Sequence, residues 1–298
     1  MNARISCRQQ TFMNPLSTYD TLVLEGGSLR CSFTAGVMDA LLLLGPLSFE
    51  RMIGVSAGSM VMATHLAGQY KHFYRISREL VEDGKFIRFT SAWSKEGLMN
   101  LAHLKAHVMR HAPLDLDALT EAQTKTHALV VTTHFDTGQP CYLEPRGQEW
   151  VDALVASASL PLVTRGKVKF RGKWMFDGGY SDPLPLDKAL DLGGKNVLVV
   201  RTRPIGDHVS QSYVDSFCSY WYRHHKELAP LFEQGHAKYN ATVDRLLTGG
   251  DEEGRTWEEI APPFPLLTDS WSVGAKEVAM DYRLGVETAM NWWAHRTL

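Results

Sequence analysis

The sequence has little of what marks a metal site, a disulfide framework or a membrane span. Its four cysteines are widely scattered and form no Cys-x-x-Cys pair, so neither zinc ligation nor a disulfide framework is indicated. The longest unbroken run of hydrophobic residues, Ala40 to Leu44, is far too short to cross a bilayer. We therefore expect no metal, no cofactor and no transmembrane segment.

A strong excess of one charge is also missing. Lys and Arg number 31 and Asp and Glu 33, a net charge of −2, which argues against nucleic acid as a partner. Residues 1–19 are polar, lack the apolar core of a signal peptide, and are predicted to form a disordered or extended tail. The chain is expected in the cytoplasm, with peripheral contact at a membrane as an alternative.

Residues 20–205 alternate short apolar runs with helical patterns. Strands are predicted at 21–24, 52–55, 128–135, 168–170, 174–176 and 196–200, with 141–143 pairing back on 128–135. Helical spacing follows the first strand and ends at Gly45-Pro46. This order predicts an α/β fold, with a mainly parallel central sheet and helices on both faces.

Residues 206–298 carry helical patterns and no clear strand, and they are rich in aromatic residues such as Phe217, Tyr220 and Trp221. We expect a helical C-terminal region that packs on the α/β domain, with most of these aromatic side chains in a core between helices and sheet. An interfacial membrane surface is the less favoured interpretation.

The stretch from Gly54 to Gly58 joins a predicted strand to a helix rich in small and apolar residues. Its Gly-x-Ser-x-Gly pattern is typical of a nucleophile elbow, in which Ser56 occupies a strained turn and the glycines let strand and helix approach. The N-terminus of the following helix favours negative charge beside that serine. From this motif alone, a glycine-rich turn with a helix-capping serine is the alternative.

A second motif, the loop Gly26-Gly27-Ser28-Leu29-Arg30, lies between the first strand and its helix. It fits a dinucleotide site poorly, because the third glycine is missing and no acidic residue ends the next strand. Its backbone N–H groups suit an oxyanion hole instead. Arg30 either buttresses the loop or meets a phosphate group.

A third motif, Asp177-Gly178-Gly179, follows a predicted strand. It places the aspartate on a loop, where its carboxylate can project into a site. Taken alone, a simple Asp-Gly turn is the favoured interpretation.

In this order the three motifs resemble those of the patatin-like phospholipase family, and the segment Ala156 to Pro161 resembles one that the family carries before its aspartate motif. The resemblance covers roughly residues 21–205. It implies a three-layer patatin-like fold, with a catalytic domain over residues 20–205, and the activity of a bacterial serine lipid acyl hydrolase on a lipid or acyl ester.

The resemblance also implies a Ser–Asp dyad. Ser56 would attack the ester carbonyl and Asp177 would act as general base without a histidine, while Gly26, Gly27, Ser28 and Leu29 hold the oxyanion. Supporting roles fall to the remaining motif residues, namely Arg30, Gly54, Gly58, Gly178 and Gly179.

Two alternatives stay open. A Ser–His–Asp α/β-hydrolase esterase would add a histidine such as His208 or His236 to Ser56 and Asp177, although only two strands are predicted before the serine. A catalytically impaired lipid-binding module of the same fold is suggested by Ser28 and Cys31, which stand where the family has glycines.

Overall fold

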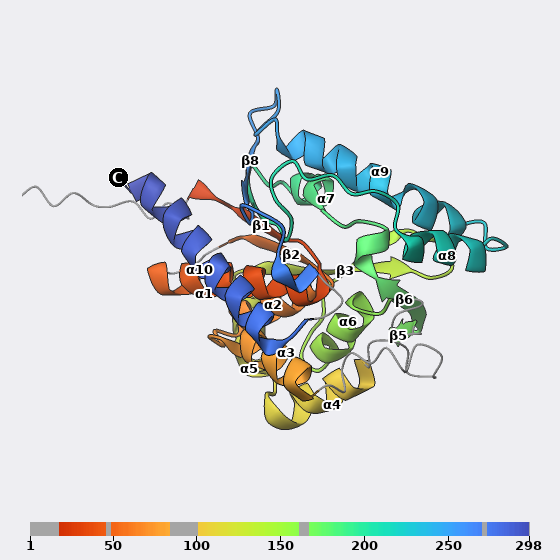
Figure 1. Cartoon of the computed structure of the whole chain (residues 1–298), viewed down its shortest axis with the longest axis horizontal. Coiled ribbons are helices and arrows are strands. Elements are labelled where there is room, and N and C mark those ends of the chain that lie inside the picture. The colour runs from red at the N-terminus through yellow and green to blue at the C-terminus, as the bar shows by residue number, and fades with distance from the viewer. Residues whose placement is uncertain (1–17, 46–48, 84–100, 161–166, 270–272, 298) are drawn as a thin grey trace, which may run out of the picture.

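The computed structural model describes residues 18–45, 49–83, 101–160, 167–269 and 273–297 (Figure 1). The predicted N-terminal tail therefore lies almost entirely outside the described residues. The strands are β1 (Thr21–Leu24), β2 (Arg51–Val55), β3 (His127–His134), β4 (Pro140–Leu143), β5 (Val168–Phe170), β6 (Lys173–Asp177), β7 (Asn196–Val200) and β8 (Thr256–Ile260).

Helices separate most of these strands. They are α1 (Cys31–Leu44), α2 (Ala57–Leu66), α3 (His72–Asp83), α4 (Leu101–His111), α5 (Leu116–Ala122), α6 (Glu149–Ser157), α7 (Leu186–Asp191), α8 (Tyr213–Trp221), α9 (Ala229–Leu246) and α10 (Ala275–Thr297), with short 3-10 turns η2 (Ser28–Arg30), η4 (Gly178–Tyr180) and η5 (Leu267–Asp269). Within the described ranges, none of the helices has the length and apolar character needed to cross a membrane.

The strands form one sheet in the order β5-β6-β3-β2-β1-β7-β8, with β4 paired to β3. From β3 to β8 every neighbouring pair is parallel, whereas β4, β5 and β6 run antiparallel to their neighbours. The predicted α/β fold with a mostly parallel central sheet is thus confirmed.

Helices cover both faces of this sheet (Figure 1). On β1, Leu22 and Leu24 pack into the core shared with α1, α2, α6 and α10, and Val23 packs into the core shared with α7 and α9. A strand buried on both faces must be apolar along its whole length. This is why β1 and β7 form continuous apolar runs in the sequence.

The prediction that residues 206–298 contain no strand is wrong, because β8 pairs in parallel with β7. Its sequence, Thr-Trp-Glu-Glu-Ile, does not look like a buried strand, since two glutamates interrupt the apolar pattern. Both carboxylates have distant partners: Glu258 accepts from Trp292 Nε1 at 2.9 Å and Glu259 from Arg201 Nη1 at 2.9 Å. Tertiary partners therefore make this strand possible.

Arg201, directly after β7, is fully buried and links that strand to β8 and α9. Besides Glu259 on β8, its guanidinium donates to Tyr239 Oη of α9 at 2.8 Å, and that hydroxyl donates to Glu25 Oε1 at 2.8 Å. Glu25 also accepts from the backbone N–H of Thr202 at 2.6 Å. Because a buried charge is tolerated only when it is paired, this network holds in place the residue that precedes the glycine loop.

The pairing register of the strands places Ser56 and Asp177, from two of the sequence motifs, at the same height along the sheet. Val55 of β2 pairs with Val131 of β3, and Thr132 of β3 pairs with Asp177 of β6. Ser56 and Asp177 therefore flank β3 at the same height, each about 4.8 Å from it in the direction of strand pairing. The loop after β1 ends at this edge too, the carboxyl edge of the parallel strands, where α/β folds place their sites.

Candidate active site

Ser56 stands in a sharp turn between β2 and α2. Its backbone has φ 51° and ψ −129°, a strained region for a residue with a side chain, and the side chain does not cap the helix. A Cβ at Gly54 would lie 2.5 Å from Ser59 Cα, and one at Gly58 would lie 2.5 Å from Glu25 O. Gly54 thus lets β2 and α2 approach, and Gly58 lets α2 approach the end of β1, which agrees with the geometry predicted for the Gly-x-Ser-x-Gly turn.

The hydroxyl of Ser56 is hydrogen-bonded directly to Asp177, the aspartate of the third motif. Ser56 Oγ donates to Asp177 Oδ2 at 2.6 Å, while Asp177 Oδ1 accepts from the Gly179 N–H at 2.7 Å. A Cβ at Gly178 would lie 2.4 Å from Val131 O, so the turn passes tightly against β3. The carboxylate is therefore held at both oxygens, with one aimed at the serine.

Burial changes the acidity of this carboxyl group. Asp177 is 3% exposed. Burial raises the pKa of Asp177 to about 6, against the hydrogen bonds from Ser56 and Gly179, which lower it. A carboxylate with such a pKa is a stronger base than an exposed one and is still mostly ionised at neutral pH.

The C-terminal turn of α6 holds both members of this pair. Ser157 Oγ accepts from the Ser56 N–H at 2.8 Å and donates to Val131 O at 2.6 Å. Ser159 O accepts from the Asp177 N–H at 2.8 Å. The sequence indicated no role for Ser157 or Ser159. The feature that could have indicated one is the pair of serines at the otherwise apolar end of the helix, in the segment that resembles the family.

The glycine loop lies against the elbow. A Cβ on Gly26 would lie 3.0 Å from Ser56 Cβ, and Gly26, Gly27 and Ser28 line one groove with that serine. Ser28 has φ 52°, a left-handed conformation that glycine adopts more readily. Leu29 follows with its side chain buried. The loop therefore lies next to Ser56 even with serine at position 28.

Arg30 is tied into the loop. Its Nη1 donates to Asp269 Oδ1 at 2.6 Å, and its Nε would lie 3.1 Å from a Cβ on Gly27. Cys31, the other substituted position, is buried and its Sγ donates to Glu25 O at 3.6 Å. These contacts favour the buttressing role of Arg30 over the phosphate-binding one.

The two histidines considered for a triad do not join Ser56 to Asp177. His208 Nε2 lies 2.8 Å from Asp244 Oδ1. His236 lines the groove in which Ser56 and Asp177 lie. Neither stands between the serine and the aspartate, because those two side chains are in direct contact.

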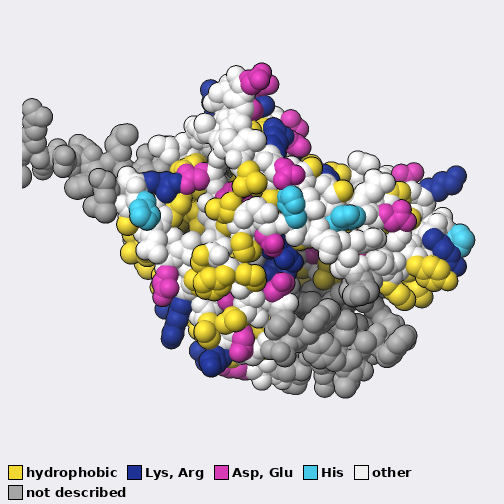
Figure 2. Space-filling model, turned by 45° about the horizontal axis from the view of Figure 1, so that its top comes forward, with side chains coloured by type: hydrophobic (Ala, Val, Ile, Leu, Met, Phe, Trp, Pro, Cys, Tyr) yellow, Lys and Arg dark blue, Asp and Glu magenta, His cyan; other side chains and the backbone are white. Residues whose placement is uncertain are grey.

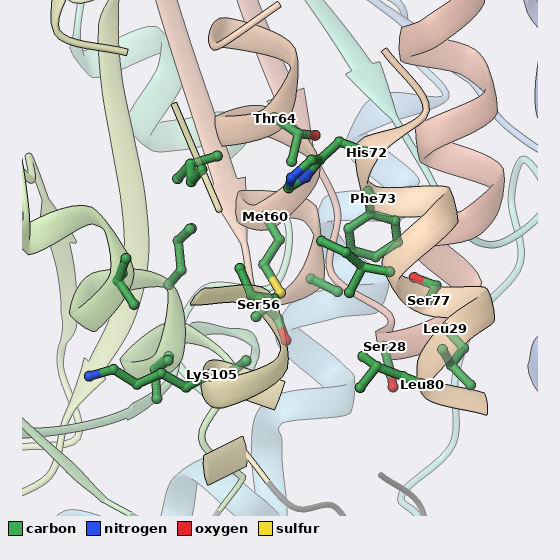
Figure 3. A pocket seen from close by; sticks show the side chains of 18 of the residues that line it. Ser28, Leu29, Ser56, Met60, Thr64, His72, Phe73, Ser77, Leu80 and Lys105 are labelled. Carbon is green, nitrogen blue, oxygen red and sulfur yellow. The ribbon is translucent and has the colours of Figure 1, made fainter. Parts of the chain in front are cut away.

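An apolar cavity opens at Ser56 between α2, α3, α4 and α6 (Figure 3). Figure 3 shows Ser56, Met60 and Thr64 following one another along α2 on its wall. The remaining wall is mainly aliphatic and aromatic, and includes Phe73, Ile76, Leu80, Val108, Leu154 and Val155. The cavity can hold a hydrocarbon chain that begins at the serine.

A second groove, with a more polar lining than the cavity, meets Ser56 from the side of α8 and α9, and we call it the polar groove. Its lining includes the charged or polar residues Arg30, Asp177, Arg203, Ser212, Asp215 and His236, the glycines Gly26 and Gly27, and the apolar residues Val209, Leu231 and Phe232. The serine thus lies where an apolar cavity and a polar groove meet, and the two are enclosed by different sets of helices.

Fold and geometry together define the class: an α/β protein with a Gly-x-Ser-x-Gly strand-to-helix turn whose serine is hydrogen-bonded to an aspartate. A family model described as patatin-like phospholipase matches residues 22–190. The chain belongs to this family, which confirms the family predicted from the sequence. Membership implies lipid acyl hydrolase chemistry.

Several known proteins are similar to this chain over most of its length. The uncharacterized protein YjjU of Escherichia coli (strain K12) is 28% identical over 281 residues, which cover 89% of this chain and 74% of that protein. The crystal structure of VipD from Legionella pneumophila matches with a TM-score of 0.52 at 12% identity, over 93% of this chain and 67% of that one. The similarity to VipD shows the fold alone. The type III effector ExoU matches with a TM-score of 0.40 at 12% identity, over 94% of this chain and 54% of that one.

The raised pKa of Asp177 predicts a stability effect. Between the ordinary aspartate pKa and about 6, the folded state holds a proton that the unfolded state has lost, so the free energy of unfolding falls as pH rises. Asp177→Asn removes this ionisation and should stabilise the protein above pH 6 by up to ~3 kcal/mol. Urea unfolding between pH 4.5 and 8 measures the effect.

The control is Asp117→Asn, which changes an exposed carboxyl on α5. The gain in Asp177→Asn should grow from pH 4.5 to about 6 and then level off, whereas the control should follow wild type. Parallel curves for all three proteins would show that Asp177 titrates normally.

Proposed function

We propose that the chain is a serine lipid acyl hydrolase of the phospholipase A, lysophospholipase or esterase type, in which Ser56 is the nucleophile and Asp177 the general base. The observation that carries this proposal is the 2.6 Å hydrogen bond from Ser56 Oγ to Asp177 Oδ2 at a strained strand-to-helix turn. Membership in the patatin-like family supports it.

In the proposed reaction, Ser56 Oγ attacks the ester carbonyl carbon while its proton passes to Asp177. The tetrahedral intermediate collapses, the acyl group stays on the serine, and the leaving alcohol takes the proton from Asp177. Water then attacks the acyl-enzyme with the same carboxylate as base, which releases the fatty acid and restores the serine. The raised pKa of Asp177, about 6, suits both directions of proton transfer.

The oxyanion is assigned to backbone N–H groups of the loop Gly26-Gly27-Ser28-Leu29. Support comes from the contact between Gly26 and Ser56 and from the groove that they share. One such donor contributes about 3 kcal/mol of transition-state stabilisation in comparable enzymes. Arg30 holds this loop through Asp269 and so acts as a positioning residue.

The two openings at Ser56 suggest how the substrate lies. The acyl chain enters the apolar cavity along α2, because its wall matches hydrocarbon. The leaving alcohol, with any headgroup, occupies the polar groove that contains Arg30, Arg203 and His236. No metal or cofactor takes part in the proposed reaction.

The decisive experiment combines active-site labelling with mutagenesis. A fluorophosphonate probe should label wild type and leave Ser56→Ala unlabelled, and Ser56→Ala should not hydrolyse a p-nitrophenyl ester. Asp177→Asn should lower kcat by roughly 10²–10⁴, the usual contribution of a positioned base. His236→Ala is the matched control, because that residue lines the groove without contacting the serine hydroxyl.

Each alternative has its own outcome. A folded His236→Ala protein as inactive as Ser56→Ala would replace the dyad with a triad. A folded wild type that is neither labelled nor active would favour the impaired lipid-binding module. In an active dyad, kcat/KM should rise with pH and level off above about 6, the pKa of Asp177.

Ser157 should matter for turnover. Ser157→Ala leaves the Ser56 N–H without its acceptor and frees the elbow from α6, so kcat should fall about tenfold, equivalent to ~1.4 kcal/mol, with little change in KM. Ser159→Ala is the control, because among the described residues the Ser159 hydroxyl bonds to Val155 O of α6, and the backbone contact to Asp177 remains. Equal losses in the two variants would deny Ser157 a specific positioning role.

The cavity predicts a preferred acyl length. From Ser56 to Thr64 the wall follows α2 for about 12 Å, which accommodates an extended chain of roughly eight to ten carbons. Thr64→Phe should fill the far end and move the optimum in a p-nitrophenyl ester series to shorter chains. Thr64→Val, which replaces the hydroxyl with a methyl group of similar size, should leave the optimum unchanged. An unaltered profile in Thr64→Phe would place the acyl chain elsewhere.

A further inference from the structure

The outer face of α8 carries large aromatic side chains in solvent. Phe217, Tyr220 and Trp221 are 51%, 63% and 62% exposed, and the Phe217 and Trp221 rings stack at 6.1 Å between centroids. The opposite face is anchored, because Cys218 is buried in a cluster with Phe232 of α9. The helix is therefore docked by one side and leaves its aromatic side free.

Further aromatic residues, from β6 and from the turn after β3, lie beside this surface. Trp174 of β6 is 38% exposed, and Lys167 Nζ lies 5.1 Å from its ring centroid and 3.7 Å from that of Phe135. The Phe135 ring in turn lies 6.0 Å from Tyr222 and 5.6 Å from His225, just after α8. We call Trp174, Phe217, Tyr220 and Trp221, with the basic residues beside them, the aromatic rim.

Basic side chains outnumber acidic ones along the rim, although the net charge of the chain is −2. Segments 167–174 and 213–228 contain the two acidic residues Asp215 and Glu227 and the six basic residues Lys167, Lys169, Arg171, Lys173, Arg223 and Lys226. Arg171 is paired with Glu149 at 2.7 Å, and Ser219 of α8 donates to Glu233 at 2.7 Å. Arg223 Cζ lies 4.3 Å from the Tyr220 ring centroid. At the right of Figure 2, hydrophobic, basic and histidine side chains lie at the tip of the molecule, with acidic side chains beside them, where Figure 1 places α8.

This combination matches the boundary of a lipid bilayer. Tyr and Trp place an apolar ring in the acyl region and a polar group in the headgroup layer, and basic side chains beside them attract anionic headgroups. The rim also adjoins the site. Ser212 and Asp215 at the start of α8, and Phe232 of α9, line the polar groove that leads to Ser56.

We propose that the aromatic rim is an interfacial binding surface for bilayers that contain anionic lipid, and that it holds the mouth of the polar groove against the membrane. The proposal rests on the proposed function in one respect, that the substrate resides in a bilayer. A second copy of the chain is the weaker candidate, because it would cover the same groove and would meet like charge.

The experiment measures binding in the Ser56→Ala background, so that no lipid is consumed and the result does not depend on turnover. Sucrose-loaded phosphatidylcholine vesicles, with and without phosphatidylglycerol, are sedimented with the full chain. Phe217→Ser/Trp221→Ser should lower the partition coefficient on the order of tenfold or more. Arg223→Gln/Lys226→Gln should remove most of the preference for phosphatidylglycerol.

The matched control is Leu43→Ser/Met290→Ser, which removes exposed hydrophobic side chains, 70% and 47% exposed, from α1 and α10. It should bind vesicles like the Ser56→Ala parent. With Ser56 intact, Phe217→Ser/Trp221→Ser should retain hydrolysis of a soluble p-nitrophenyl ester and lose hydrolysis of the same ester presented in vesicles.

Three results would overturn the proposal. Vesicle binding could be the same in the Phe217→Ser/Trp221→Ser variant and its parent, or the control could lose binding equally. Alternatively, light scattering could show a dimer that the rim substitution converts to monomer, with no vesicle binding, which would make the rim a self-association surface. If wild type does not hydrolyse the ester but its vesicle binding still depends on the rim, the proposed function alone is contradicted.

Discussion

The arrangement of the site depends on one hydrogen bond, which Ser56 Oγ donates to Oδ2 of the buried Asp177. Burial of Asp177 destabilises its charged form, and this is why its pKa rises to about 6. The folded protein must therefore provide compensating contacts. It does so with the Gly179 N–H on the other carboxylate oxygen and with the α6 turn, whose Ser157 and Ser159 bind the two backbones.

The glycine loop depends on a different set of buried contacts. Glu25 precedes the loop and is held by Tyr239 and Thr202, and Tyr239 in turn accepts from the buried Arg201. These partners come from α9 and from the end of β7, and β8 supplies the counter-charge of Arg201 through Glu259. The C-terminal third of the chain therefore does more than cover the sheet, because it completes the charge pairing on which the loop position rests.

Much of this could be predicted from local pattern. Apolar strands such as β1 and the Gly-x-Ser-x-Gly spacing report constraints that act between sequence neighbours, so the fold class and the turn at Ser56 were accessible. The local pattern at Asp177 favoured only a simple turn, and its pairing with Ser56 came from the resemblance to the family. β8 was not, since its glutamates are acceptable only because Arg201 and Trp292 reach them from other elements. Ser157 was missed for the same reason, since its hydroxyl serves Ser56, which lies 101 residues away in the chain.

The position of Ser56 between two unlike spaces constrains how a substrate can approach. The apolar cavity lies among α2, α3, α4 and α6, whereas the polar groove is bounded by α8 and α9. An ester carbonyl at Ser56 must then have its acyl chain and its alcohol in different environments. A lipid drawn from a bilayer has this polarity, and its headgroup end would face the helix pair that carries the exposed aromatic residues Phe217 and Trp221. In the proposed function, the orientation of the protein on a membrane and the orientation of the substrate in the site thus follow from one feature, the placement of α8 beside the groove.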